Sequence, residues 1–401
     1  MATTYDHLME YVRARRIVNT HCHHLRDQDF APYDLDALLK NSYVAWCGVP
    51  WNETRESRVN LLEKVRFNSL FVWLHKSLQE IYDVDEPLTA DNWERLSSMV
   101  REVHRDRQRH IEMLKDLCGY AKVIEDAYWD PGSDNGHPDL FAPTFRVNSF
   151  LFGYSRTVVD HDGNNALVLY DRRIQDIDEY IGFVREMVRL KIGQGCVALK
   201  VPVAYDRRLD FEPATQEAAQ RAFVPDGAQA DEADVKAFQD YVFYEMCNIA
   251  AEFDVPIQCH TGMGRLRRTQ AMWMREVIEQ NPQTKFVLLH CSYPWVDDIA
   301  ALLRYYPNVY PDLSMLPLYS TSSCQRALHE LIEGGTSDKV CWGCDTWTPE
   351  ESYGSLLAFR HVLVKVLADK VDEGYFSLDD ARAVTDNITY HNPLKLYRLS
   401  V

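Results

Sequence analysis

The chain has 401 residues, 46% of them hydrophobic, which is enough to build one sizeable domain core. Its formal net charge of −17 argues against nucleic acid or an anionic membrane as the main partner. No apolar stretch approaches the roughly 18 residues of a membrane span, and the first residues lack the basic-then-apolar pattern of a signal peptide. We therefore expect a cytoplasmic protein.

The first strand-like segment ends in two histidines. A β-branched run at 17–20 is followed by His21 and His23, with Cys22 between them. Side chains two residues apart on a strand point to the same face, so both imidazoles can bind one metal ion. A His-x-His pair alone is a weak signal. It gains weight only if other segments bring further ligands to the same place.

A long segment precedes the next strand. Between His24 and about Gly119 the chain shows helical patterns, such as those at 58–65 and 93–103. A βα loop usually has only a few residues. We therefore predict that residues 25–119 form a helical insertion within a single domain that spans 1–401.

The remaining strand-like segments are short apolar runs bounded by turn residues, which is typical of parallel strands buried on both faces. They lie at 120–124, 145–151, 196–200, 255–260, 285–290, 308–313 and 339–345. Segments of helical length separate several of them, as at 234–246, 270–278 and 295–303. Four of the runs stop at a residue that can bind a metal ion or an anion, namely Lys200, His260, His290 and Asp345.

Eight strands that alternate with helices predict parallel pairing through right-handed crossovers. The fold class is therefore α/β, a closed (β/α)8 TIM barrel, and the insertion at 25–119 would lie over its mouth. In such a barrel the reactive groups sit at the C-terminal ends of the strands. The scattered residues then form one cluster, made of His21, His23, Lys200, His260, His290 and Asp345.

This ordered set resembles that of the amidohydrolase superfamily of metal-dependent barrel enzymes. The resemblance covers nearly the whole chain, down to 387–397, which is similar to the closing helix of that family. The large insertion after the first strand most resembles the uronate isomerase branch and its hydrolase-like relatives. The full motif set of a uronate isomerase is absent, so the resemblance implies architecture more than reaction.

The cluster offers three imidazoles and a carboxylate, from His21, His23, His260 and Asp345. This set suits one Zn²⁺ ion, and also Mn²⁺ or Fe²⁺. A bound ion would lower the pKa of a water ligand from about 15.7 toward about 7 and so supply hydroxide. We expect Asp345 to be the general base for that water, because its carboxylate can touch ion and water at once.

The roles of His290 and Lys200 depend on the metal count. With one ion, His290 is free to polarise the substrate, and Lys200 as an ammonium would bind a substrate carboxylate. With two ions, His290 ligates the second, and the resemblance implies a Lys200 carboxylated by carbon dioxide that bridges both. We favour one ion, because the branches with a large insertion after the first strand use one.

Basic and aromatic residues just past the strand ends suggest a carboxylate-bearing substrate. Arginine can hold a carboxylate with two parallel hydrogen bonds, and we name Arg207 and Arg265 as candidates. Tyr205 is the preferred contact that does not bind metal, and Trp347 is expected near the barrel mouth.

Three functions remain open. The first is hydrolysis of an amide, lactone or similar bond in a small carboxylate-bearing molecule. The second is a non-hydrolytic reaction on the same metal site, either aldose–ketose isomerisation of a uronate or decarboxylation by a lyase mechanism. The third is a non-catalytic barrel with a structural metal, which would leave His290 and Lys200 unexplained. A homo-oligomer is compatible with each.

Overall fold

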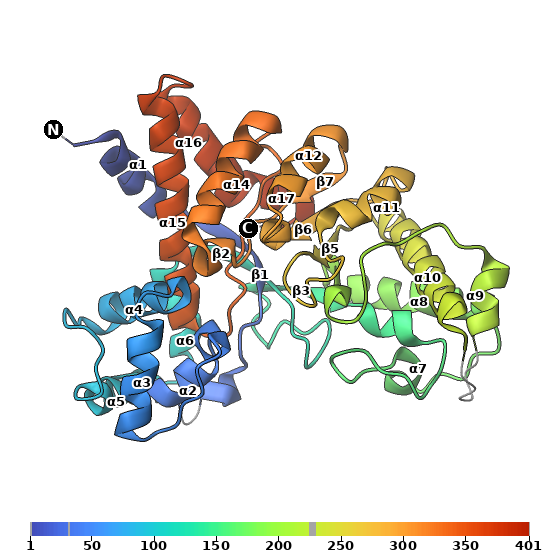
Figure 1. The fold of residues 1–401 in the computed structure, drawn as a ribbon, viewed down its shortest axis with the longest axis horizontal. Helices are drawn as coiled ribbons and strands as arrows, with labels where there is room; N and C mark the ends of the chain where they lie inside the picture. The colour runs from blue at the N-terminus through green and yellow to red at the C-terminus, as the bar shows by residue number, and fades with distance from the viewer. Residues whose placement is uncertain (1, 31–32, 224–229, 401) are drawn as a thin grey trace.

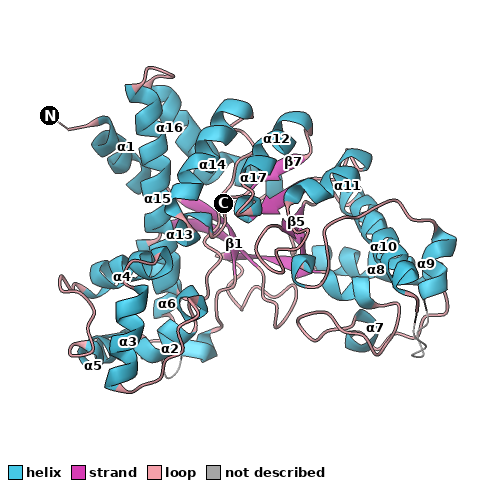
Figure 2. Ribbon diagram, viewed as in Figure 1, coloured by secondary structure: helices cyan, strands magenta, loops and turns pink. Residues whose placement is uncertain are grey.

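The computed structural model describes residues 2–30, 33–223 and 230–400. Its centre is one curled, wholly parallel sheet in which each strand pairs with the next along the chain. The seven strands are β1 (Ile17–Cys22), β2 (Tyr120–Glu125), β3 (Phe141–Arg146), β4 (Ala198–Val201), β5 (Ile257–His260), β6 (Phe286–Leu289) and β7 (Val309–Pro311). The strands gather in the middle of the molecule, between groups of helices (Figure 2). This is a TIM-barrel-like α/β fold.

The predicted eighth strand at 339–345 is not a regular strand. It makes a single bridge, between Asp312 and Cys341. Its backbone nevertheless bonds to both ends of the sheet, since Cys341 N donates to Pro311 O at 2.9 Å and Asp345 N donates to His21 O at 2.9 Å. The extended conformation stops at Asp345, which has a left-handed backbone with φ of 59°.

The prediction for the third strand was wrong. The strand is 141–146, and the predicted run at 145–151 continues into a 3-10 helix at 148–152. Its apolar residues are buried against a helix instead, since the Phe150 ring lies 5.4 Å from that of Phe183. Pro143 lies inside the strand. Proline is unusual in the interior of a sheet, so the sequence did not indicate that the strand begins at 141.

Helices connect the strands (Figure 1). Those outside the β1–β2 connection are α1 (Thr4–Arg13), α7 (Ala166–Leu169), α8 (Ile177–Gly193), α9 (Gln216–Ala222), α10 (Glu232–Glu252), α11 (Arg275–Gln280), α12 (Asp297–Tyr305), α13 (Leu316–Tyr319), α14 (Thr321–Gly334), α15 (Pro349–Asp372), α16 (Leu378–Asp386) and α17 (Asn392–Tyr397). The helix predicted at 234–246 is confirmed as part of α10, and the one predicted at 295–303 overlaps α12, which begins two residues later. The helix predicted at 270–278 divides into a 3-10 turn at 271–274 and α11.

The connection between β1 and β2 is long and helical. It holds α2 (Leu35–Lys40), α3 (Arg55–Val65), α4 (Ser69–Tyr82), α5 (Trp93–Val103) and α6 (Arg109–Glu112). Most of these helices form a group at the lower left of Figure 1. They share an apolar cluster that includes Leu61, Leu74 and Trp93 and reaches Leu318 of α13 and Ala358 of α15. None of the described helices combines the length and apolar character needed to cross a membrane.

Gly343 lets the chain between β7 and α15 pass closely against β1. A Cβ atom at this position would lie 2.4 Å from His21 N and 2.9 Å from His21 O. Gly343→Ala should therefore push the segment off β1 and destabilise the protein by about 1–3 kcal/mol, measured by urea unfolding. Gly334→Ala is the control, because a Cβ there meets nothing within 4 Å. Equal stability of the two variants would contradict the close approach.

Candidate metal centre

The two histidines of the first strand converge on one carboxylate. His21 lies on β1 and is fully buried, and His23 follows the strand directly. Their Nε2 atoms lie 3.3 Å and 3.2 Å from the same oxygen, Oδ1 of Asp345. Segments more than 300 residues apart in the sequence thus meet at the C-terminal edge of the sheet.

Asp345 is buried and charged. Burial alone would raise its pKa, but His21 beside it, together with His23 and His290, holds that pKa well below the usual range. Burial lowers the pKa of His21 to about 3, so this imidazole is neutral at neutral pH. The site therefore presents an ionised carboxylate to neutral nitrogen donors, which is the arrangement that a divalent cation requires.

Lys200 approaches the same imidazole from β4. Its Nζ lies 2.9 Å from His21 Nε2 and 4.0 Å from Oδ2 of Asp126. Burial lowers the pKa of Lys200 to about 8. The single Nε2 of His21 thus faces both a lysine and a carboxylate, while its Nδ1 is buried without a hydrogen-bond partner in the described structure. A polar nitrogen in this state is costly unless a further group binds it.

His260 and His290 present two nitrogens to each other. His260 Nε2 lies 2.6 Å from Met263 O, and His290 Nδ1 lies 3.0 Å from Ser314 O. A carbonyl oxygen only accepts, so both of these ring nitrogens carry the proton. Burial keeps both rings neutral, since it lowers the pKa of His290 to about 4 and that of His260 well below 6.5.

The remaining nitrogens are therefore bare. His260 Nδ1 and His290 Nε2 face each other at 3.0 Å, and neither has a proton to donate. Two lone pairs at this distance repel unless a cation lies between or beside them. His290 Nδ1 is also 3.6 Å from Oδ2 of Asp345, so this pair adjoins the His21–His23–Asp345 group.

Sequence reasoning missed Asp126 and Arg146. Asp126 follows β2, and its backbone oxygen lies 2.7 Å from His23 Nδ1. Its Oδ2 accepts a hydrogen bond from Arg146 Nη1 at 2.7 Å, and Arg146 is buried on β3. His21, His23 and Asp126 can place one ligand atom each within 4.8 Å of one another. The sequence does contain a signal for Asp126, because it lies close to the end of a predicted strand, as Asp345 does.

Two of the predicted substrate contacts lie beside the cluster. The Tyr205 ring centroid is 4.6 Å from that of His260, and the Trp347 ring stacks on His23 at 5.9 Å. Tyr43, from the β1–β2 connection, packs on Trp347 at 4.8 Å. One wall of the site is therefore aromatic.

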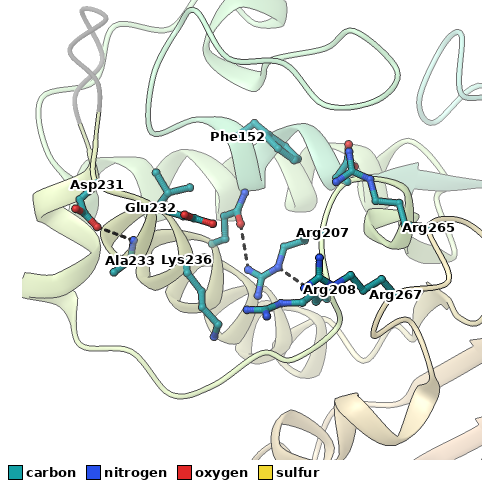
Figure 3. Close-up of a pocket in the computed structure, with 12 residues that line it drawn as sticks. Phe152, Arg207, Arg208, Asp231, Glu232, Ala233, Lys236, Arg265 and Arg267 are labelled. Carbon is teal, nitrogen blue, oxygen red and sulfur yellow. Dashed lines mark hydrogen bonds between the residues drawn. The ribbon is translucent and has the colours of Figure 1, made fainter.

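The two predicted arginines point elsewhere. Arg207 Nη2 is paired with Asp240 at 2.8 Å, and Arg265 is exposed. Both line a pocket of about 770 Å³ together with Arg208, Arg267 and Lys236 (Figure 3). The 3-10 turn after β4 ends at Tyr205, so the chain has already turned away from the cluster when it reaches Arg207. Proximity in sequence to a strand end did not bring these side chains to the site.

Arg146 neutralises Asp126 in a place without water. Arg146→Met removes the hydrogen-bonded partner of this buried carboxylate and leaves only Lys200, at 4.0 Å, as a nearby full positive charge, so it should destabilise the protein by about 3–5 kcal/mol in urea unfolding. The double variant with Asp126→Asn should recover part of that loss, because it removes the charge at position 126, although Asp162, the other carboxylate that Arg146 contacts, still lacks its partner. A single-variant cost below about 1 kcal/mol, as for surface ion pairs, would contradict this assignment.

Comparison with known proteins identifies related chains. The family model described as "Amidohydrolase" matches residues 191–399. Protein fluG of Emericella nidulans is 29% identical over 222 residues, covering 51% of this chain and 26% of that protein. Uronate isomerase of Streptococcus equi subsp. equi is 22% identical over 283 residues, covering 64% of this chain and 60% of that enzyme. The chain thus spans less than two thirds of either relative.

A solved structure shares the fold. A protein from Lactobacillus casei assigned as a metal-dependent hydrolase superposes with a TM-score of 0.73 at 18% identity. The match covers 98% of this chain and 99% of the other. At this identity the likeness concerns the fold alone.

Proposed function

This chain belongs to the amidohydrolase family, and from that premise we propose that it is a metal-dependent hydrolase of a small carboxylate-bearing molecule. The bond cleaved would be an amide, a lactone or a similar acyl bond. The observation that carries the proposal is the buried carboxylate of Asp345, which lies within 3.3 Å of two imidazoles delivered by another strand.

We assign the metal ligands to His21, His23, His260 and Asp345. The two bare nitrogens of His260 and His290 support a cation in this cluster. Nitrogen and carboxylate donors together suit Zn²⁺, with Mn²⁺ or Fe²⁺ as alternatives. When bound, the ion supplies Lewis acidity to the reacting carbonyl and to water.

Asp345 is the general base in this proposal. Its two oxygens face different partners, since Oδ1 lies near His21 and His23, and Oδ2 lies near His290. The depressed pKa of Asp345 keeps this carboxylate ionised, so its oxygens carry no proton and can serve as the acceptor. His290 lies beside Oδ2 of Asp345, and in this proposal it is the residue that polarises the substrate.

One ion is favoured over two. Lys200 Nζ lies 2.9 Å from His21 Nε2, a direct contact with no group between the two nitrogens. As an ammonium, Lys200 is instead placed to bind a substrate carboxylate, in the manner of a compact point charge.

In this proposal Tyr205 and Trp347 line the substrate site, and the helical segment at 25–119 covers it. Tyr43 of that segment packs on Trp347, which in turn stacks on His23, so the segment supplies part of the wall. The contacts of Arg207 and Arg265 do not support a role in holding the substrate, because Arg207 is already paired with Asp240. Lys200 takes that role in our proposal.

Uronate isomerisation is the second candidate, and sequence similarity to a uronate isomerase favours it. The same residues suit this reaction, because moving a proton between adjacent carbons needs a base such as Asp345 beside a polarised carbonyl. Decarboxylation on the same site has no comparison in its favour among these relatives. Fold alone does not choose between these reactions.

The reaction class is tested with three substrate panels: N-acyl amino acids and lactones, uronates, and aromatic acids. Zinc-loaded protein should release acid and amine or alcohol from a member of the first panel. A ketose formed from a uronate, with no hydrolysis of the first panel, would contradict the hydrolase assignment and support the isomerase.

Asp345→Asn is the variant that ties the activity to this site. It should lower kcat by about 10²–10⁴-fold, because the amide cannot accept the proton. Asp139→Asn changes the same charge at an exposed position and should leave kcat unchanged. Full activity of Asp345→Asn would remove Asp345 from the reaction.

A further inference from the structure

A second group of histidines and a carboxylate lies in the segments that follow β1 and β2. Asp27 begins a 3-10 turn at 27–30, His110 lies on α6, and His137 lies in the loop that leads to β3. Residues from three separate segments thus meet at one point. None of them belongs to the cluster around Asp345.

The three side chains have the spacing of a metal site. Oδ1 of Asp27 lies 3.0 Å from His110 Nε2 and 2.7 Å from His137 Nε2. One ligand atom from each residue lies within 4.8 Å of the others. Ligands around a tetrahedral Zn²⁺ with bonds of about 2.0–2.1 Å stand roughly 3.3 Å apart. The distances of 3.0 Å and 2.7 Å from Oδ1 to the two nitrogens are about 0.3 Å and 0.6 Å shorter than this spacing.

His110 is held in place by contacts on the side of its ring that faces the protein interior. It is almost fully buried, its ring stacks on Phe30 at 4.3 Å, and its Nδ1 lies 2.7 Å from His24 Nε2. Metal-bound histidines usually have such a partner at the second ring nitrogen, which fixes the ring and the proton. His24 Nδ1 is itself buried and has no hydrogen-bond partner in the described part of the chain.

The outer side of the group is open to solvent. The side chains of Asp27 and His137 are 36% and 17% exposed, whereas that of His110 is 1% exposed. An ion can therefore enter from solvent and keep a water ligand. Gln108 Nε2 donates to Oδ2 of Asp27 at 3.2 Å, which leaves Oδ1 for the ion.

We propose that Asp27, His110 and His137 bind a second divalent metal ion, for which Zn²⁺ is the best match to two imidazoles and one carboxylate. The site has three protein ligands and one open position. It stands on its own residues and does not depend on the proposed hydrolase function.

The second ion would stabilise the segments that surround the first centre. It ties the loop before β3 to the segment after β1, and Asn135 of that loop donates to His24 O at 2.7 Å. The connection after β2 also carries Tyr128, whose ring lies 5.6 Å from that of His23. Fixing this connection therefore restrains the surroundings of His23, a proposed ligand of the first ion.

The test is Zn²⁺ stoichiometry. The protein is stripped with chelator, titrated with Zn²⁺ as the only added ion, and followed by calorimetry and elemental analysis. Wild type should bind two equivalents, and Asp27→Asn and His137→Gln should each bind one. Asp139→Asn, which changes the same charge two residues from His137, should bind two. His137→Cys, which supplies a thiolate ligand, should regain the second equivalent.

His23→Gln separates this site from the proposed active centre. It should also bind one equivalent, and that equivalent should disappear in the double variant with His137→Gln. One equivalent in wild type that His137→Gln retains, or two in His137→Gln, would overturn the proposal. The second of these results is what a two-ion centre with carboxylated Lys200 would give.

A measurement on wild type keeps the proposal testable if the variants fail to fold. Diethyl pyrocarbonate modifies accessible imidazole nitrogens, and peptide mass spectrometry reads each histidine. Zn²⁺ should slow the modification of His137 at least several-fold and leave that of exposed His7 unchanged. Equal modification of His137 with and without Zn²⁺ would overturn the proposal.

Discussion

Two unprotonated imidazole nitrogens, 3.0 Å apart and buried, set the constraint on which the rest of this molecule depends. The carbonyl oxygens of Met263 and Ser314 hold the protons of both rings on the opposite nitrogens. Beside them lies an ionised carboxylate that faces two further imidazoles. A cation at this place would satisfy the two nitrogens, and metal binding would then add to the stability of the fold.

The sheet creates this constraint by its geometry. Parallel strands bring their C-terminal ends to one edge, and the residues after β1, β5 and β6 meet there with the segment that ends at Asp345. That segment forms no regular strand but bonds to both β7 and β1, and Gly343 lets it lie against His21. The backbone contacts of this segment therefore place the carboxylate of Asp345 at the edge of the sheet.

Much of this was predictable from the sequence. Apolar runs that stop at His23, His260, His290 and Asp345 indicated both the strands and their shared edge, because the run and its polar end are local features. The third strand could not be predicted, because Pro143 lies inside it and the apolar run that follows packs on a helix. Asp126 was overlooked although it obeys the same rule. Arg207 was misplaced because its partner Asp240 lies on a helix 33 positions further along the chain, and sequence spacing does not reveal such a pairing.

The most direct measurement is an anomalous difference map at the zinc edge, from crystals of the zinc-loaded protein. The account predicts a peak in contact with His21, His23 and the carboxylate of Asp345. Zinc that is bound in the crystal but absent from the reach of Asp345, for example confined to Asp27 and His137, would contradict the central claim.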